Sequence, residues 1–447
     1  MAMLFRSTNR NSPSVGFKEA LMQGQAPDYG LYMPGTIPQF TKQEIASFQE
    51  KSYPEIAFEI AKKYVDKIDD SKLRKLVDDA YDFEVPIERL NDDLYIMRLD
   101  RGPTASFKDF AARLMARLMH YFAEKENQKL TILVATSGDT GGAVADAFYG
   151  LKNINVIVLF PEKEVSDRQR KQMTTLGKNV KAIAVKGKFD DCQALVKRAF
   201  NDPELKSLNL TSANSINFGR LMPQMVYYFY AQSRIKGKVN FSVPSGNFGD
   251  LMGGVFAREM GLPVNKFIVA VNGNDEFPKF LAAGQYAPVV PSKECSSNAM
   301  NVGHPSNLAR LIDLYGGWLT DERDSNGIVA KKGFLREKPD MEKMRKDFVS
   351  FSITDQEVDE AIKKVSENYS AIIEPHGAVG IAAALKSKIK GKIICLETAD
   401  PAKFPDKIKE LLGIEPKVPE SLSHLDNKQE IYVTVENDYS DLKHLIK

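Results

Sequence analysis

Residues 130–142 have the sequence LTILVATSGDTGG, in which an apolar run leads into a loop of small and hydroxyl-bearing residues. The run is rich in β-branched side chains and is typical of a buried strand. Small residues at the carboxyl end of a strand, where a helix begins, form a natural cradle for an anion or another ligand. A plain strand-to-helix turn has the same composition, so this stretch alone leaves both interpretations open.

The pattern of this stretch recurs along the chain. The clearest helix is predicted at 106–125, where apolar residues follow the three-four spacing of one helix face. Further buried strands are predicted at 154–160, 180–185, 238–243, 266–271 and 391–398, with helical patterns between most of them. This alternation predicts an α/β protein with a doubly wound, mostly parallel sheet.

The length of 447 residues exceeds that of one ordinary core, so several subdomains are expected. Residues 1–92 are rich in helical patterns and poor in strands, which predicts an N-terminal subdomain. A catalytic region is expected over 93–413, with an insertion of loops and helices at about 273–352, where Gly, Pro, Asn and Ser are frequent. Residues 414–447 form a C-terminal tail with one strand-like run at 431–435.

The composition is that of a soluble globular protein, with 43% hydrophobic and 27% charged residues. The net charge is +2 and the charges are interspersed, so neither a nucleic acid nor a membrane is the expected partner. Cys192, Cys295 and Cys395 lie far apart, which favours isolated thiols over disulfides or a zinc site, and no metal-ligand spacing is visible. Without a long apolar stretch or a secretion signal, a cytoplasmic enzyme is expected.

Residues 101–110, RGPTASFKDF, place Lys108 in the first turn of the predicted helix, with Thr104 or Ser106 as a possible cap. The positive end of the helix dipole repels an ammonium group and favours the neutral amine, which can form an imine. A solvated lysine near a helix start is also common, so the motif does not decide the matter by itself.

Two other loops are candidate anion sites. Residues 244–254, PSGNFGDLMGG, follow a predicted strand, and glycines there let backbone N–H groups approach a phosphate closely. The loop lacks the Lys-Ser/Thr ending of a nucleotide P-loop, which favours a phosphate other than that of ATP. Residues 214–220, NSINFGR, end on Arg220, whose guanidinium suits a bidentate grip on phosphate or carboxylate. A structural turn and a helix cap with a surface salt bridge are the respective alternatives.

Two positions near the end of the chain complete the set. His376, in the stretch 374–380 that opens an apolar helix, is more often a structural than a catalytic residue when it stands alone. Thr398 follows the last predicted strand and is placed at the same edge of the sheet as the other motifs.

Taken in order, these motifs resemble those of the threonine synthase family, which are pyridoxal-phosphate enzymes of fold type II (tryptophan synthase β-like). The resemblance covers most of the chain, and it includes 7–10 and 24–34 near the start. GPTASFKDF is similar to the lysine motif of the family, SGDTGGA to its substrate-side loop and SGNFGD to its cofactor-phosphate loop. Residues 297–307 resemble a stretch of the longer, bacterial and fungal type. The resemblance implies two doubly wound open sheets with helices on both faces, plus the helix-rich N-terminal subdomain.

The resemblance also implies roles for individual residues. Lys108 is the implied catalytic residue and the Schiff-base lysine for pyridoxal 5′-phosphate, and Thr398 faces the pyridine nitrogen. A neutral hydroxyl there suits elimination and replacement better than transamination. The other implied cofactor-binding residues are Asp139, near the 3′-oxygen, then Ser245, Gly246, Asn247, Phe248 and Gly249, whose backbone N–H groups hold the phosphate, and Asp250. The implied substrate-binding residues are Thr136, Ser137, Thr140, Asn214, Ser215 and Arg220.

The reaction implied is that of a carbon–oxygen lyase, the last step of threonine biosynthesis. Phosphate is lost from O-phospho-L-homoserine by γ-elimination, and water then adds at Cβ to give L-threonine. A dehydratase, a phospholyase that yields 2-oxobutyrate, and a catalytically silent relative are the alternatives. A small-molecule substrate, no nucleic acid or membrane partner, no metal, and a monomer or homodimer are expected.

Overall fold

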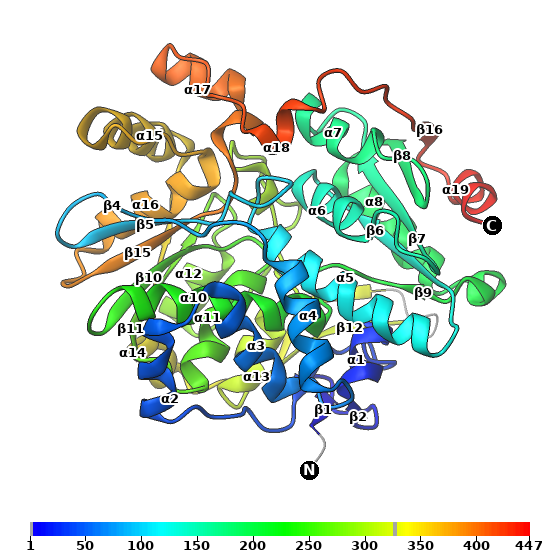
Figure 1. Cartoon of the computed structure of the whole chain (residues 1–447), viewed down its shortest axis with the longest axis horizontal. Helices are drawn as coiled ribbons and strands as arrows, with labels where there is room; N and C mark the ends of the chain where they lie inside the picture. The colour runs from blue at the N-terminus through cyan, green and yellow to red at the C-terminus, as the bar shows by residue number, and fades with distance from the viewer. Residues whose placement is uncertain (1–2, 325–328) are drawn as a thin grey trace.

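Two parallel β-sheets organise the chain and lie side by side in the computed structural model, which describes residues 3–324 and 329–447 (Figure 1). The larger has the order β14 (Phe348–Ser352), β11 (Val264–Val271), β10 (Val239–Pro244), β15 (Ile393–Glu397), β5 (Leu94–Arg98) and β4 (Ile87–Arg89). The smaller has the order β16 (Val433–Glu436), β8 (Val180–Lys186), β7 (Ile154–Pro161), β6 (Leu130–Ala135) and β9 (Leu210–Thr211). Within these two sheets, all strand pairs are parallel except the pair of β4 with β5.

Helices cover both faces of each sheet, which explains why the central strands are mostly apolar. On the six-stranded sheet, α16 (Pro375–Ser387) packs on one face, and α11 (Gly249–Glu259) with α10 (Met225–Arg234) on the other. On the five-stranded sheet, α6 (Asp139–Phe148) and α8 (Phe189–Phe200) take opposite faces. Every residue of β6 and β10 is buried as a result. This confirms the predicted α/β class and the doubly wound sheets.

The remaining helices connect the strands or extend the layers. They are α5 (Lys108–Lys125), α7 (Asp167–Thr174), α9 (Phe218–Leu221), α12 (Glu276–Ala283), α13 (Leu308–Leu314), α14 (Met341–Asp347), α15 (Asp355–Tyr369), α17 (Pro405–Leu412), α18 (Glu420–Ser423) and α19 (Tyr439–Ile446). Among the described residues, no helix has the length and apolarity that a membrane span requires.

The N-terminal region is helical, as predicted, but it also contains a small sheet. Helices α1 (Phe17–Gln23), α2 (Lys42–Ser47), α3 (Tyr53–Tyr64) and α4 (Asp70–Ala80) are joined by an antiparallel sheet of β1 (Leu4–Ser7), β2 (Val15–Gly16) and β3 (Tyr32–Pro34). Strands of two to four residues are too short for an alternating pattern to be read in the sequence. The helices α3 and α4 pack against α10 and α5, so this region shares the main core.

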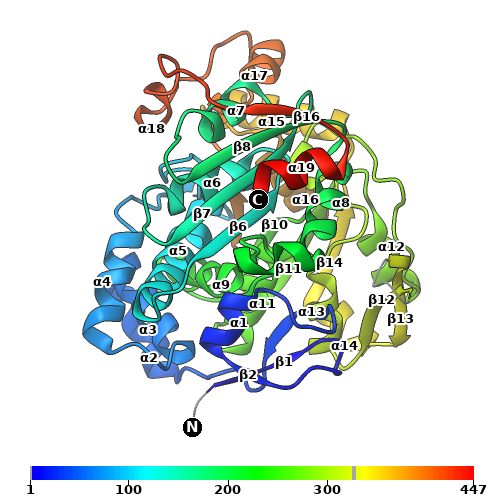
Figure 2. The ribbon, with the colours of Figure 1, turned by 90° about the vertical axis from the view of Figure 1, so that its right-hand side faces the viewer.

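Two later regions contain more strand structure and more contacts with the sheets than the sequence pattern indicates. The insertion at about 273–352 is not only loops and helices, because it holds the antiparallel pair β12 (Trp318–Arg323) and β13 (Val329–Glu337) and ends in β14, an edge strand of the six-stranded sheet. The tail is part of the five-stranded sheet: β16 falls at the predicted run and pairs with β8, while α19 packs on α8 (Figure 2).

Candidate active site

A cavity of about 640 Å³ lies between the two sheets and is lined by loops that follow their strands. Fourteen of the fifteen residues predicted for the site line it. They are Lys108, Thr136, Ser137, Asp139, Thr140, Asn214, Ser215, Arg220, Gly246, Asn247, Phe248, Gly249, Asp250 and Thr398. The exception, Ser245, is buried just behind the wall. Residues far apart in the sequence are brought together because the carboxyl ends of parallel strands meet at one edge of each sheet.

Lys108 is the first residue of α5 and projects into this cavity. The preceding loop is tied to the end of β15, since the Phe107 N–H donates to the Thr398 carbonyl at 2.9 Å. Burial lowers the pKa of the Lys108 amine. The charge of Asp139 opposes this shift in the pKa of Lys108, and the cation of Lys403 reinforces it. The neutral, nucleophilic form of the amine is therefore favoured.

The expected capping of α5 by Thr104 or Ser106 is wrong. Phe107 occupies the N-cap position, and no side chain caps it. Thr104 instead donates its backbone N–H, at 2.9 Å, and its hydroxyl to the carboxylate of Asp109. The carboxylate of Asp109, in the first turn of the helix, thus accepts hydrogen bonds from the preceding Gly-Pro turn. In a simple cap the residue before the helix would instead accept from a helix N–H group.

The loop after β10 presents backbone groups to the cavity. Within the described residues, the N–H groups of Gly246, Asn247 and Phe248 donate no hydrogen bond to the protein. A Cβ on Gly246 would lie 2.9 Å from the Cα of Met300, so the insertion presses directly on this loop. The Ser245 N–H already donates to the Ala270 carbonyl at 2.8 Å, which removes it from the set predicted to hold the phosphate.

The loop after β6 is organised by Thr136. Its hydroxyl oxygen accepts from the N–H groups of Gly138 and Gly141, at 3.0 and 2.8 Å. Gly138 has a φ of 131°, a conformation that only glycine adopts readily, and a Cβ there would collide with Gln169. The Thr136 oxygen is therefore used to shape the loop, while Ser137 and Thr140 line the cavity.

Arg220 is a buried cation at the cavity wall. Its guanidinium donates to the Ala213 carbonyl at 2.6 Å, and its Nε has no hydrogen-bond partner. Burial lowers the pKa of Arg220 to about 10, which still leaves it charged at neutral pH. Among the described residues no carboxylate forms an ion pair with it. An unneutralised buried guanidinium of this kind is suited to a bound anion.

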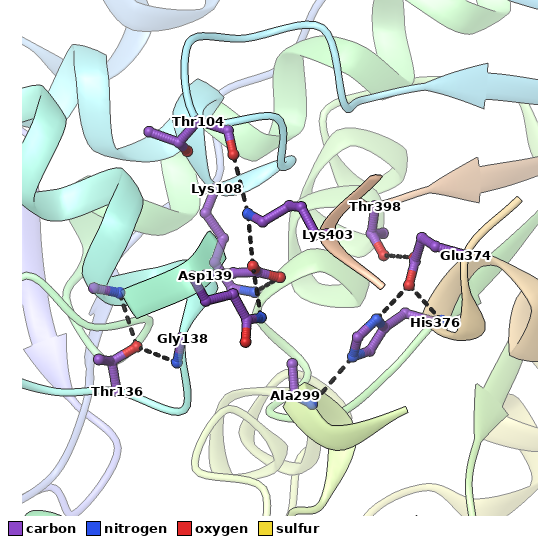
Figure 3. A network of polar contacts seen from close by, with 12 residues as sticks. Thr104, Lys108, Thr136, Gly138, Asp139, Ala299, Glu374, His376, Thr398 and Lys403 are labelled. Atoms are coloured by element: carbon purple, nitrogen blue, oxygen red, sulfur yellow. Dashed lines mark hydrogen bonds and ion pairs between the residues drawn. The ribbon is translucent and has the colours of Figure 1, made fainter. Parts of the chain in front are cut away.

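Asp139 lines the cavity and is paired, on the side away from it, with Lys403, a residue that the sequence analysis did not single out (Figure 3). Lys403 is fully buried, and its Nζ lies 2.6 Å from Asp139 Oδ1 and donates to the Thr104 carbonyl at 3.0 Å. The Lys108 Nζ is 3.8 Å from Asp139 Oδ2. No sequence pattern marks a buried lysine, which explains why Lys403 was missed.

The hydroxyl of Thr398 donates to Glu374 Oε1 at 3.2 Å (Figure 3). Glu374 caps α16, accepting from the N–H groups of His376 and Gly377. His376 Nε2 accepts from the Ala299 N–H at 3.1 Å, so its Nδ1 is assigned as the donor to Glu374. Both ring nitrogens of His376 are occupied by protein partners, in keeping with a structural role.

Asp250 follows the loop at 246–249 and is the second residue of α11. The hydroxyl of Tyr228 donates to its carboxylate at 2.8 Å, and that of Tyr227 donates to the same oxygen. Burial raises the pKa of Asp250 to about 6.

A further cluster that sequence reasoning missed joins the two candidate anion loops. The fully buried Arg310 of α13 donates to the carbonyls of Tyr32 and Ile216, at 3.1 and 2.6 Å, and to Asn307. Asn307 in turn donates to the Asn247 carbonyl at 3.0 Å. The insertion therefore holds the loop at 214–220 against the loop at 246–249.

These residues fit pyridoxal phosphate. Free backbone N–H groups at the start of α11 suit its phosphate, and a buried lysine with a favoured neutral amine suits its aldehyde. Gly246 is required in this loop, because a Cβ at that position would collide with Met300. The fold and the site together define a pyridoxal-phosphate-dependent enzyme of fold type II.

Comparisons with known proteins agree and narrow the class. Residues 84–398 match the family described as pyridoxal-phosphate dependent enzyme, 4–81 match the threonine synthase N terminus, and 377–446 match the threonine synthase C-terminal family. Threonine synthase of Pseudomonas aeruginosa is 35% identical, covering 99% of this chain and 97% of the relative. That of Escherichia coli K12 is 35% identical, covering 98% and 97%.

Solved structures give the same result. PLP-bound threonine synthase from Brucella melitensis superposes with a TM-score of 0.92 at 35% identity, covering 100% of this chain and 99% of that one. The yeast enzyme gives 0.89 at 33% identity, covering 100% and 98%. The chain belongs to the threonine synthase family.

Proposed function

We propose that this chain converts O-phospho-L-homoserine and water into L-threonine and phosphate. The observation that carries the proposal is one cavity in which Lys108 shares the wall with two separate anion-binding features. These are the backbone loop at Gly246–Gly249 and the buried guanidinium of Arg220. A phosphorylated substrate adds a second phosphate to that of the cofactor and calls for a buried cation such as Arg220, whereas a dehydratase of an unphosphorylated amino acid has only the substrate carboxylate to bind beside the cofactor phosphate.

Pyridoxal phosphate, when bound, supplies an electron sink that makes loss of a proton from the substrate feasible. Lys108 would hold it at one end, and the N–H groups of Gly246, Asn247 and Phe248 would hold its phosphate. Thr398 lines the cavity, and its hydroxyl hydrogen, which goes to Glu374 in the structure, would turn to the ring nitrogen when the cofactor is bound. A hydroxyl does not keep that nitrogen protonated, which suits elimination and addition of water.

The substrate side of the cavity would bind and orient the phosphoamino acid. Arg220, which lines the cavity and forms no ion pair with a described carboxylate, would bind the substrate phosphate through its guanidinium and stabilise it as a leaving group. Ser137 and Thr140 would bind the carboxylate at the start of α6, where the helix dipole favours an anion. Asn214 and Ser215 line the same cavity, on the loop that Arg310 holds through the Ser215 carbonyl.

The Lys108 Nζ would accept a proton from the substrate and return one later. Burial lowers the pKa of Lys108, which favours the neutral amine, the form that can act as a base. The cavity wall also includes Thr8 and Asn9 of the N-terminal region and Thr320 of β12. These segments would limit the access of water until the phosphate has left.

The test is to incubate the purified protein with pyridoxal phosphate and O-phospho-L-homoserine. Products are identified by mass spectrometry beside a phosphate assay, with Lys108→Ala as the control. Threonine and phosphate in equal amounts, absent in the control, are expected. Phosphate with 2-oxobutyrate would replace the synthase by a phospholyase. No turnover of a protein that binds the cofactor would contradict the proposal, and serine and threonine would then be tried as dehydratase substrates.

A further inference from the structure

The carboxylate of Asp139 lies between two lysines that are placed very differently (Figure 3). Lys403 is fully buried behind the cavity wall and contacts Asp139 at 2.6 Å. Lys108 lines the cavity and stands 3.8 Å from the other oxygen of the same carboxylate. Gln169 adds a neutral donor, its Nε2 lying 3.0 Å from Asp139 Oδ1. One anion is thus shared unequally between two cations.

Electrostatics give this unequal sharing a consequence. A carboxylate alone beside Lys108 would stabilise the ammonium form and so suppress the neutral amine. A buried lysine is costly unless an anion or hydrogen-bond acceptors balance it. Lys403 finds both, in Asp139 and in the Thr104 carbonyl. The charges of Asp139 and Lys403 therefore largely cancel. As a result, Asp139 attracts the ammonium form of Lys108 less strongly than an unpaired carboxylate would.

We propose that Lys403 is a positioning residue: it neutralises Asp139 and holds that carboxylate in place, so that Lys108 presents its amine in the neutral form. The proposal deepens the proposed function and rests on it for the role of Lys108. Lys403 acts only through Asp139, since it does not line the cavity. The Asp139–Lys403 pair would serve as a neutral polar unit in the floor of the site.

The electrostatics of Asp139 support this account. Burial alone would raise the pKa of Asp139, but its neighbours, Lys403 above all, hold it well below its usual range. The other titratable groups that act on Lys108 or Asp139 are Arg220, Asp250, and the pair Glu374 and His376, which come from three other segments. All four are retained in the variants below, so their influence is common to each comparison.

The test measures the titration of Lys108 directly, without substrate. The full-length chain, freed of cofactor, is labelled with a trace of acetic anhydride between pH 6 and pH 10, and the label is mapped by peptide mass spectrometry. Exposed Lys363 serves as the internal standard. Four proteins are compared: the natural sequence, Lys403→Met, Asp139→Asn, and the double variant. Methionine preserves most of the volume of lysine and removes only the charge and the donors.

The proposal predicts an order. Lys403→Met leaves Asp139 paired with Lys108 alone, raising the pKa of Lys108 by about one unit and slowing its labelling about tenfold at pH 7. Asp139→Asn lowers the pKa of Lys108, because an unneutralised Lys403 remains. The double variant loses one charge of each sign and returns to within about threefold of the natural sequence.

A purely structural Lys403 would leave the labelling profile unmoved in Lys403→Met, and that result overturns the proposal. So does a double variant that follows Lys403→Met rather than the natural sequence. If Lys403→Met does not fold, recovery of folding on adding Asp139→Asn supports charge balance, and failure of both to fold overturns it. Cofactor-loaded protein is labelled in parallel. Protection of Lys108 there tests the proposed function separately from the role of Lys403.

Discussion

The loop after β10 of the six-stranded sheet presents backbone N–H groups to the cavity, whereas the loops after β6 and β9 of the five-stranded sheet present side chains. Gly246, Asn247 and Phe248 offer main-chain donors, and the insertion presses on them from behind. Ser137, Thr140 and the nearby cations offer hydroxyl and charged groups. The first wall suits a phosphate that stays bound, and the second suits a substrate that must be recognised, react and leave.

The two walls should therefore respond to different kinds of change. A backbone site tolerates side-chain replacement but not an added atom on the glycine that approaches the ligand. A side-chain site responds to the loss of a single functional group. Four predictions test this difference, in order of decreasing effect.

Arg220→Met removes the buried cation of the substrate wall. We expect kcat/KM for O-phospho-L-homoserine to fall by about 100- to 1000-fold, because the guanidinium stabilises the departing phosphate. Affinity for pyridoxal phosphate should stay the same, as measured by equilibrium titration of its absorbance. Arg198→Met, on the exposed side of α8, is the matched control. A loss of less than about threefold would mean that the substrate phosphate binds elsewhere.

Gly246→Ala adds one methyl group to the backbone wall. Its Cβ would stand 2.9 Å from the Met300 Cα and 3.1 Å from the Ala299 carbonyl oxygen, so the loop must shift. We expect cofactor affinity to weaken about 30- to 100-fold, which corresponds to about 2–3 kcal/mol. Gly142→Ala in the opposite wall meets Gln172 at 3.2 Å and should change that affinity little. Equal effects of the two substitutions would remove the distinction between the walls.

The buried carboxyls of the two walls, Asp250 and Asp139, should make the free energy of unfolding depend on pH in opposite directions. Burial raises the pKa of Asp250 to about 6, so its contribution to stability is present below about pH 4 and is lost as pH rises through 6. The nearby ammonium groups of Lys403 and Lys108 lower the pKa of Asp139, so its contribution is present at neutral pH and is lost in acid.

Urea unfolding between pH 3.5 and pH 8 measures both. Between pH 4 and pH 8, the free energy of unfolding of Asp250→Asn should rise by about 2 kcal/mol relative to that of the natural sequence. Asp139→Asn should be most destabilised at neutral pH, and its deficit should narrow in acid. Parallel profiles for the two variants would show that the carboxyls do not differ in the way described.

Thr136→Val removes the hydroxyl that shapes the loop after β6. Two N–H groups, of Gly138 and Gly141, lose their acceptor, and we expect a loss of about 1–2 kcal/mol in unfolding free energy. The KM for substrate should also rise. Thr136→Ser keeps the oxygen and should stay near the natural sequence in both measurements. A serine variant as weak as the valine variant would point to the methyl group instead.

The sheets were predictable because the sequence of a buried parallel strand is a nearly continuous apolar run. The strands β6, β7, β8, β10, β11 and β15 all coincide with such runs. Apart from β5, an interior strand of five residues, the strands that were missed are short or lie at an edge. β14, with the sequence FVSFS, alternates apolar and polar residues inside a stretch rich in loops, and only its pairing with β11 makes it a strand. Tertiary contact decides such segments, and a local pattern does not contain it.

The site was predictable to the extent that its residues lie in recognisable loops. Lys108, Arg220 and Gly246 belong to motifs that chemistry singles out, and the parallel sheets bring them to one cavity. Lys403 and Arg310 belong to no motif, because their importance lies in buried contacts with Asp139 and with distant backbone carbonyls. The supporting layer of a site follows from the fold, and it becomes visible only once the fold is known.

The most direct test of the account is to locate the lysine that holds the cofactor. The protein loaded with pyridoxal phosphate is reduced with borohydride, digested, and analysed by peptide mass spectrometry. The account predicts a pyridoxyl group on Lys108 alone, with none on the buried Lys403 beside it. A pyridoxyl group on Lys403, on any other lysine, or on no lysine at all would contradict it.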